Sequence, residues 1–246
     1  MARQNKRFLS LFISLLLFPV TLYYFSPALI LGAALDGIIN GSCIVFALQF
    51  VCSLFTGRLF CSWICPAGGL QEALMPSRPK TPKQGWRNNI KHGIWFIWLA
   101  IVAFCYFKSW PIKGIDFFLE TQNGISATSV QSYAIYYFII AIVAITAIAG
   151  GDRAFCHYLC WMAPFMITGI KLGKLAGLPA IAVSCELEKC TSCGSCAQKC
   201  PMGIEPKYAR ENSECIHCAE CVDICTQKAL SIKYSIGNKD GYREEA

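Results

Sequence analysis

The chain has 246 residues, of which 55% are hydrophobic and 15% are charged. Because a typical soluble domain has about 25% charged residues, this composition excludes an ordinary soluble protein, and no nucleic-acid partner is expected. Sixteen cysteines are far more than chance provides, yet the chain is too long for a small secreted scaffold built on disulfides.

Charge and cysteine content both change near residue 185. Residues 1–184 have 14 Lys and Arg against 5 Asp and Glu, a net charge of +9, whereas residues 185–246 have 8 against 10, a net charge of −2. Nine of the cysteines lie between Cys185 and Cys225. We therefore predict an α-helical membrane domain over 1–184 and a separate cysteine-rich domain over 185–246.

Four apolar stretches of the first region are candidates for transmembrane helices. A helix needs roughly 20 apolar residues to cross the hydrocarbon core of a bilayer. The uncharged stretches are Phe8–Leu31 with 24 residues, 37–57 with 21, 92–107 with 16 and 121–151 with 31. The sequence therefore predicts four transmembrane helices, the last of them centred on 133–150.

The basic residues between these stretches predict the orientation. Twelve Lys and Arg lie on one side of the membrane, in the segments 1–7, 58–91 and 153–174, and only Lys108 and Lys113 lie on the other. By the positive-inside rule, both termini and the second domain are cytoplasmic in a multi-pass protein of the cell inner membrane. The alternative for the first stretch is a cleaved signal peptide, but the stretch is too long and lacks a clear cleavage site.

Two segments of the first region do not read as spans. Residues 78–83 alternate basic residues with Pro79 and Pro82, which is typical of an irregular linker. Ala154–Ile170 has no charge but is followed by Lys171 and Lys174. We expect a helix at the cytoplasmic interface or a partly re-entrant segment there, because a fifth span would place the second domain outside the cell.

The second region contains two cysteine runs with the same C-x2-C-x2-C-x3-C spacing. Such runs bind [4Fe–4S] clusters, and the fourth cysteine of each run ligates the cluster of the other run. We assign one cluster to Cys190, Cys193, Cys196 and Cys225, and the second cluster to Cys215, Cys218, Cys221 and Cys200. Zinc is the alternative, but this spacing does not match the usual zinc sites.

The same region predicts an α+β domain like a bacterial 2[4Fe–4S] ferredoxin. Apolar residues alternate with polar ones over 230–236, which indicates a strand paired with another near Ile181–Cys185. About 60 residues bury little apolar surface, so the clusters are expected to hold this domain together. Thr226 stands where proline usually follows the fourth cysteine, a difference expected to tune the cluster without preventing its ligation.

A second repeat lies in the membrane region. The motif R-x-F-C-x3-C occurs at Arg58–Cys65 and at Arg153–Cys160, an offset of 95 residues, which indicates a duplicated helical hairpin. Its cysteines, Cys61, Cys65, Cys156 and Cys160, supply enough thiolates for a third iron–sulfur or metal centre. Arg58 and Arg153 would offset the negative charge of that centre. A dithiol, or simple packing of small apolar residues, is the alternative.

The remaining cysteines and the histidines carry less information. We interpret Cys43, Cys52 and Cys105 as packing residues and leave Cys185 undecided. The chain has only three histidines, His92, His157 and His217, and none occupies the middle of a predicted span. A haem ligated by this chain is therefore not expected. No nucleotide fingerprint or nucleophile triad is present in the sequence, so no catalytic residues are assigned.

The twin cysteine motifs and the double ferredoxin run resemble the NapH family of membrane ferredoxin-type proteins, with related modules in NosR, MauN and CcoG. The resemblance implies a quinol-linked electron-transfer component that works with an iron–sulfur protein, a flavoprotein or a cytochrome. Cys61 to Pro66 matches the family's C-x3-C-P form, whereas Trp161 replaces the proline of the second motif. This departure argues against a function specific to periplasmic nitrate reduction and for a broader branch of the family.

We therefore predict a lipid-embedded electron-transfer protein that connects a quinone or a membrane partner with a redox partner protein. It would act as the electron-transfer subunit of a quinol-linked oxidoreductase complex, without acid–base residues of its own. Two other classes stay open. One is a metallocentre assembly factor that reduces a metal or a disulfide, as the CcoG resemblance implies, and the other is a redox-sensing membrane regulator.

Overall fold

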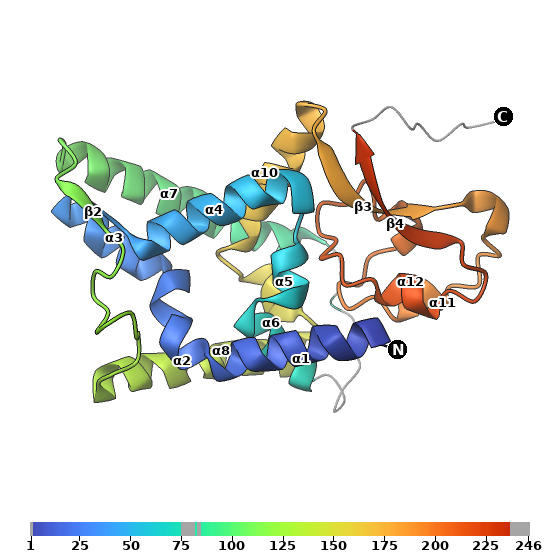
Figure 1. Ribbon diagram of the computed structural model, residues 1–246, viewed down its shortest axis with the longest axis horizontal. Coiled ribbons are helices and arrows are strands. Elements are labelled where there is room, and N and C mark those ends of the chain that lie inside the picture. Colours follow the sequence, from blue (N-terminus) through green and yellow to red (C-terminus); the bar gives the residue numbers. More distant parts are fainter. Residues whose placement is uncertain (1, 75–81, 83–84, 237–246) are drawn as a thin grey trace.

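The computed structural model describes residues 2–74, 82 and 85–236. Helices make up one end and the middle of the molecule, and the cysteine-rich domain forms the other end (Figure 1). The linker predicted over 78–83 lies outside the described residues, apart from Pro82.

The membrane part contains ten α-helices in its described residues. The helices before residue 75 are α1 (Ala2–Leu16), α2 (Phe18–Thr21), α3 (Pro27–Asp36), α4 (Gly41–Thr56), α5 (Leu59–Trp63) and α6 (Pro66–Leu74). The helices after residue 85 are α7 (Ile90–Lys108), α8 (Val130–Gly150), α9 (Ala154–Tyr158) and α10 (Ala163–Leu175). Two short strands, β1 (Ile38–Asn40) and β2 (Gly114–Asp116), pair in parallel at the end far from the cysteine-rich domain.

Within residues 2–74 and 85–236, two helical segments are long and apolar enough to cross a membrane. They are Trp86–Lys108, which includes α7, and Val130–Gly150, with mean hydropathies of 1.7 and 2.1. A third span exists if α1 and the bent segment Phe18–Phe25 count as one. The helices α3 and α4 are apolar but shorter, so the four long helices that the sequence predicts are not all present in that form.

The first predicted span is wrong as one continuous helix. The chain bends by 60° between α1 and the segment Phe18–Phe25, and α3 then starts at Pro27. Proline has no backbone N–H and is tolerated in the first turn of a helix but not in its interior. Pro19 at the start of α2 and Pro27 at the start of α3 therefore break a run that hydropathy alone reads as continuous.

The two copies of the motif have the same order of elements. In each copy a long helix, α4 or α8, leads into a short helix with the first motif cysteine, α5 or α9, and then into a third helix, α6 or α10. The third helices cross over, because α6 packs against α1 and α8, and α10 packs against α4 and α7. This exchange brings the two motifs to the centre of the molecule.

The segment predicted as an interfacial helix, Ala154–Ile170, is divided between α9 and α10. Its apolar residues do not lie apart at a surface, because Met166 and Ile167 are buried against the rest of the protein. Gly169 allows the close approach of α4, since a Cβ atom there would lie 2.9 Å from the carbonyl oxygen of Phe50. The segment is therefore a packed part of the helical domain.

The cysteine-rich domain is built on two antiparallel strands, β3 (Pro179–Cys185) and β4 (Leu230–Ile236). It therefore begins at residue 179, six residues before the predicted boundary at 185, because all of β3 pairs with β4. Ile181 pairs with Tyr234 and Cys185 pairs with Leu230, so the strand pairing that the alternation predicts is present. Two short helices lie between the strands, α11 (Ser195–Gln198) and α12 (Glu220–Ile224). The N-terminus of α1 lies beside this domain (Figure 1), which puts the start of the chain and the ferredoxin-like segment at one end of the molecule.

Candidate iron–sulfur sites

The two ferredoxin runs form loops with the same backbone conformation. In the first run Ser192 and Gly194 have φ values of 54° and 75°, and in the second run His217 and Ala219 have φ values of 55° and 64°. These residues occupy equivalent positions on either side of the second cysteine of each run. Left-handed backbone at non-glycine residues costs about 1–3 kcal/mol each and persists where the surrounding structure requires it. The repeated strain indicates a binding loop, not an arbitrary turn.

The loop conformation turns backbone N–H groups toward the thiols. The N–H of Ser195 is directed at the thiol of Cys193, and the N–H of Glu220, at the equivalent position, is directed at the thiol of Cys218. Consecutive N–H groups in such loops form a concave site for anions. This arrangement fits a cluster of thiolate ligands, whose negative charge the N–H groups would stabilise.

One cavity, here called the outer cavity, contains the first predicted ligand set. It is lined by Cys190, Cys193 and Cys196 of the first run together with Cys225 of the second run, and it has about 910 Å³ of empty space, part of it open to solvent. Cys185, at the end of β3, also lines it. Polar and charged residues also line it, and these are Thr191, Ser192, Ser195, Glu205, Lys207, Thr226 and Gln227.

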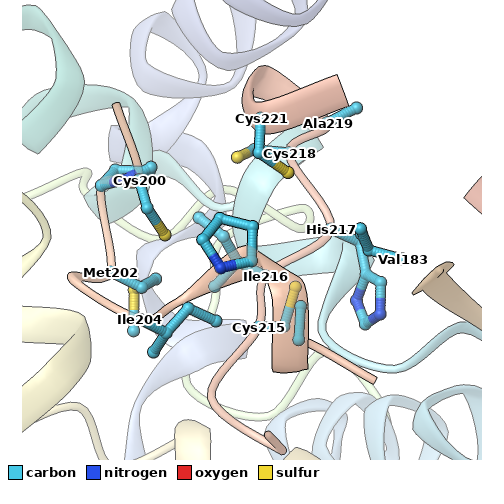
Figure 2. A pocket seen from close by; sticks show the side chains of 13 residues that line it. Val183, Cys200, Met202, Ile204, Cys215, Ile216, His217, Cys218, Ala219 and Cys221 are labelled. Atoms are coloured by element: carbon cyan, nitrogen blue, oxygen red, sulfur yellow. The ribbon is translucent and has the colours of Figure 1, made fainter. Parts of the chain in front are cut away.

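A second cavity, here called the inner cavity, contains the other set. It is lined by Cys215, Cys218 and Cys221 of the second run and by Cys200 of the first run, with about 350 Å³ of empty space (Figure 2). All four cysteines are buried. The two cavities thus collect the cysteines in the crossed grouping that the spacing predicts, and their ligation of iron stays a prediction.

Burial gives the thiols of the two cavities different acidities. Burial raises the pKa of Cys215 to about 11 and that of Cys218 to about 12. In the outer cavity the N–H and hydroxyl of Ser195 lower the pKa of the exposed Cys193. Metal ligation requires the thiolate form, so iron must displace more firmly held protons in the inner cavity than at Cys193.

The membrane part covers the inner cavity. The side-chain amide of Gln4 in α1 donates to the carbonyl oxygen of Cys218 at 3.1 Å and to the carboxylate of Asp223 at 2.6 Å. The imidazole of His217 lies against Gly57, where a Cβ atom would be only 2.5 Å from the ring. Gly57 itself has a φ of 61°, so both its conformation and its neighbour require glycine.

The twin motifs place their cysteines in one buried region. Cys61, Cys65, Cys156 and Cys160 are all at most 7% exposed. The short helices end before the second cysteine of each motif, so the two cysteines of one motif do not lie on one regular helix. Instead each motif closes with the same wide turn, in which the N–H of Cys65 donates to Phe60 at 3.0 Å and that of Cys160 donates to Phe155 at 2.9 Å.

The motif thiols lie within electrostatic reach of one another. Burial raises the pKa of Cys65 well above its usual value, and the charges of Cys156, Cys61 and Cys160 raise it further. Among the described residues, no three His, Cys, Asp or Glu side chains lie close enough together to hold a single metal ion.

Two arginines cross between the motifs. Arg153 of the second motif donates to the carbonyl oxygen of Cys61 at 2.6 Å, and Arg58 of the first motif donates to the carbonyl oxygen of Cys156 at 3.4 Å. Both side chains are fully buried. The sequence predicts these arginines as countercharges, but their reciprocal hydrogen bonds, which hold the two motifs against each other, follow only from the fold.

Each arginine is neutralised by a carboxylate that the sequence analysis did not single out. Glu72 in α6 pairs with Arg153 and, at 2.6 Å, with Arg7. Glu214 pairs with Arg58 at 2.5 Å and with Lys91 at 2.7 Å. Burial opposes ionisation of Glu214, but the charges of Arg58 and Lys91 outweigh it and lower the pKa to about 2. In the sequence, Glu72 could have been recognised as the lone acidic residue within the apolar segment 66–74.

The two motif halves differ beside their first cysteines. The amide of Gln71 donates to the sulfur of Cys156 at 3.1 Å and accepts from the N–H of Phe155 at 3.0 Å. Met166 stands 95 residues after Gln71, and its sulfur lies 3.8 Å from the sulfur of Cys61. Cys156 thus has a hydrogen-bond donor where Cys61 has a thioether.

Comparison with known proteins bears on these sites. A family model described as a 4Fe-4S binding domain matches residues 42–84 and 131–179, so it covers both copies of the membrane motif. The uncharacterized protein MJ0750 of Methanocaldococcus jannaschii is 29% identical over 75% of this chain and 76% of its own length.

Two further relatives are the proteins YccM and NirI. YccM of Escherichia coli, named for a proposed role in electron transport, is 27% identical over 78% of this chain and 56% of its own length. The protein NirI of Paracoccus denitrificans is 27% identical over 68% of this chain and 25% of its own length. No solved structure matches the chain. These matches confirm the resemblance to membrane ferredoxin-type proteins of the NapH kind.

Proposed function

Because the chain is similar to membrane ferredoxin-type proteins, we propose that it is a membrane-bound iron–sulfur electron-transfer protein with two [4Fe–4S] clusters in its C-terminal domain. The observation that carries the proposal is the crossed lining of the two cavities. Each cavity has three cysteines of one run and the fourth cysteine of the other. A disulfide scaffold or a zinc site has no need of this exchange.

Within this proposal the protein positions and tunes its cofactors. When bound, a [4Fe–4S] cluster takes up and returns single electrons, which is the chemistry that the chain itself lacks. The N–H groups of Ser195 and Glu220 stabilise thiolate charge at Cys193 and Cys218. The burial of the four inner-cavity cysteines limits their contact with water, whereas Cys193 leaves the outer cavity accessible.

The unequal burial of the two cavities supports a spatial route for electron transfer through the protein. Cys193 in the outer cavity is exposed, so a soluble redox partner can approach it closely. The inner cavity contacts the membrane part through Gln4 and Gly57. The proposed route therefore connects a soluble partner protein, by way of the outer and then the inner cavity, with the membrane part.

We extend the proposal to the membrane topology. Four spans, with both termini and the ferredoxin-like domain on the cytoplasmic side of the inner membrane, agree with the distribution of Lys and Arg. The contacts of Gln4 with Cys218 and Asp223 support a common side for the N-terminus and this domain. A quinone or quinol as the membrane reactant comes from the family resemblance.

A third centre at Cys61, Cys65, Cys156 and Cys160 is part of the proposal. It is supported by the burial of the four thiols in one region and by the crossed hydrogen bonds of Arg58 and Arg153. The 4Fe-4S family match on both motifs supports it as well. Such a centre would lie beside the inner cavity, because Glu214, the neighbour of Cys215, is paired with Arg58.

Iron quantitation of anaerobically purified protein, with EPR during a redox titration, tests the proposal. Two clusters predict about 8 Fe per chain and a third predicts about 12. The double variant Cys61→Ala and Cys156→Ala should remove only the additional signal, and the double variant Cys43→Ala and Cys52→Ala serves as a control. If the native protein and the double variant at Cys61 and Cys156 both contain about 8 Fe per chain, the third centre is contradicted. Iron-free native protein contradicts the whole proposal.

One observation favours a second function, that of a metallocentre assembly factor. The sulfur of Met166 lies 3.8 Å from that of Cys61, and a thioether beside thiols is a soft donor set that suits Cu(I). If the twin motifs handle copper, the purified protein should bind about one Cu(I) per chain. The variant Met166→Leu should weaken that binding but leave the iron of the ferredoxin-like domain unchanged.

A further inference from the structure

The two motif arginines receive their carboxylates from different parts of the chain. Arg153 of the second motif pairs with Glu72, which belongs to α6 of the first repeat and also binds Arg7 near the start of the chain. Arg58 of the first motif pairs with Glu214, which also binds Lys91 at the start of α7. Each arginine thus shares a carboxylate with a second basic residue, but only Glu72 comes from the membrane repeats.

The second repeat does not provide the corresponding acid. The residue 95 positions after Glu72 is Ile167, which is buried and apolar. The same offset relates Gln71 to Met166, Arg58 to Arg153 and Cys61 to Cys156, so the correspondence holds around the site. Glu214 of the ferredoxin-like domain therefore pairs with Arg58 as Glu72 of the repeats pairs with Arg153.

Because Arg58 and Lys91 are buried, the carboxylate that Glu214 supplies to them is energetically important. Arg58 is 0% exposed and Lys91 is 1% exposed. Removing one partner of a buried ion pair leaves an uncompensated buried charge, which is strongly destabilising. The pair between Glu214 and Arg58 is therefore expected to hold the ferredoxin-like domain in one position against the first motif.

The pair also connects the two kinds of cysteine site. Glu214 immediately precedes Cys215 of the inner cavity, and Arg58 donates both to the backbone carbonyl of Glu214 and to that of Cys156, each at 3.4 Å. His217 rests on Gly57, the residue before Arg58. One guanidinium thus contacts the backbone beside an inner-cavity cysteine and the backbone of a motif cysteine.

We infer that Glu214 is a positioning residue that docks the ferredoxin-like domain by completing the membrane site around Arg58, and so sets the inner cavity in register with the twin motifs. The contacts that dock the domain are made by protein groups, and the electron-transfer role of this docking rests on the proposed function. Its partner is therefore the chain's own membrane part, at Arg58 and Lys91. In this arrangement the membrane site is complete only when the domain is docked.

Hydrogen exchange of the full-length protein in detergent tests the inference. In Glu214→Gln, exchange at 57–62 and at 214–218 should accelerate by about a hundredfold, which corresponds to about 3 kcal/mol. Glu214→Asp should recover part of this protection, which a loss of side-chain packing alone would not explain. The matched control is Glu72→Gln, which should affect 153–157 and leave 214–218 protected.

A second variant distinguishes the loss of domain docking from the loss of charge compensation at Arg58. Ile167→Glu in the Glu214→Gln background restores a carboxylate at the position equivalent to Glu72. It should return protection to 57–62 but not to 214–218. Equal exchange in the native protein and Glu214→Gln would overturn the inference, as would a return of protection at both segments. Iron-free native protein that still shows the Glu214 effect would contradict only the proposed function.

Discussion

The outer and inner cavities share a cysteine spacing and a loop conformation but differ in their surroundings. Both loops have left-handed residues on either side of the second cysteine. The outer cavity has the exposed Cys193, whereas all four cysteines of the inner cavity are buried. The inner cavity has α1 and Gly57 packed against its loop.

One local motif thus occurs in two different surroundings. The loop provides thiols and N–H groups in both places, since these depend on residues within the run itself. The accessibility of each cavity depends on what packs against it. An exposed cavity suits exchange with a soluble partner, and a covered cavity suits exchange within the molecule.

Removal of one thiol from each cavity tests the comparison with the largest expected effect. Cys218→Ala and Cys193→Ala should each lower the iron content by about 4 Fe per chain, because a cluster that lacks a ligand is lost. Only Cys218→Ala should also increase hydrogen exchange at 57–62, since only the inner cavity meets the membrane part. If both variants change that exchange equally, the cavities are not distinct in this way.

A methyl group at Gly57 should disturb the cover of the inner cavity. Gly57→Ala adds a Cβ atom 2.5 Å from the ring of His217 at a φ of 61°, and we expect a loss of about 2–4 kcal/mol of stability. The control is Gly177→Ala, which has a φ of 68° but no atom within 4 Å of the added Cβ and should cost about 1–2 kcal/mol. Thermal loss of cluster absorbance measures both, and equal shifts would remove the role of the His217 contact.

A chelator should remove the clusters of the two cavities at different rates. With EDTA and a mild oxidant, the cluster of the outer cavity should be lost several-fold faster than that of the inner cavity, because a covered site restricts the entry of reagents. Parallel EPR and iron measurements on native protein, Cys193→Ala and Cys218→Ala assign each phase. A first phase that persists in Cys193→Ala would contradict the assignment of the outer cavity.

The smallest expected effect concerns the contact of α1 with the inner loop. Gln4→Ala removes the hydrogen bonds to Cys218 and Asp223 and should cost about 1 kcal/mol, seen as faster exchange at 218–223. The control is Gln227→Ala on the rim of the outer cavity, which should leave exchange at 218–223 unchanged. Equal effects of the two variants would show that α1 does not stabilise the inner loop.

Much of the candidate site was predictable because ligand spacing is a local property. The two C-x2-C-x2-C-x3-C runs indicate the crossed grouping of eight cysteines before any fold is known, and the alternation over 230–236 indicates its strand. The offset of 95 residues reveals the repeat in the same way. Hydropathy was less reliable for helix bounds, because Pro19 and Pro27 interrupt the first apolar run.

Tertiary structure alone decided which charges meet and which cavity is covered. Arg58 and Glu214 are separated by 156 residues, and Arg153 and Glu72 by 81, so no local pattern joins them. Their pairing arises because α6 and α10 cross between the repeats and because the ferredoxin-like domain folds back onto the first motif. Cysteine chemistry could be read along the chain, since it depends on neighbours in sequence, whereas burial and ion pairing depend on neighbours in space.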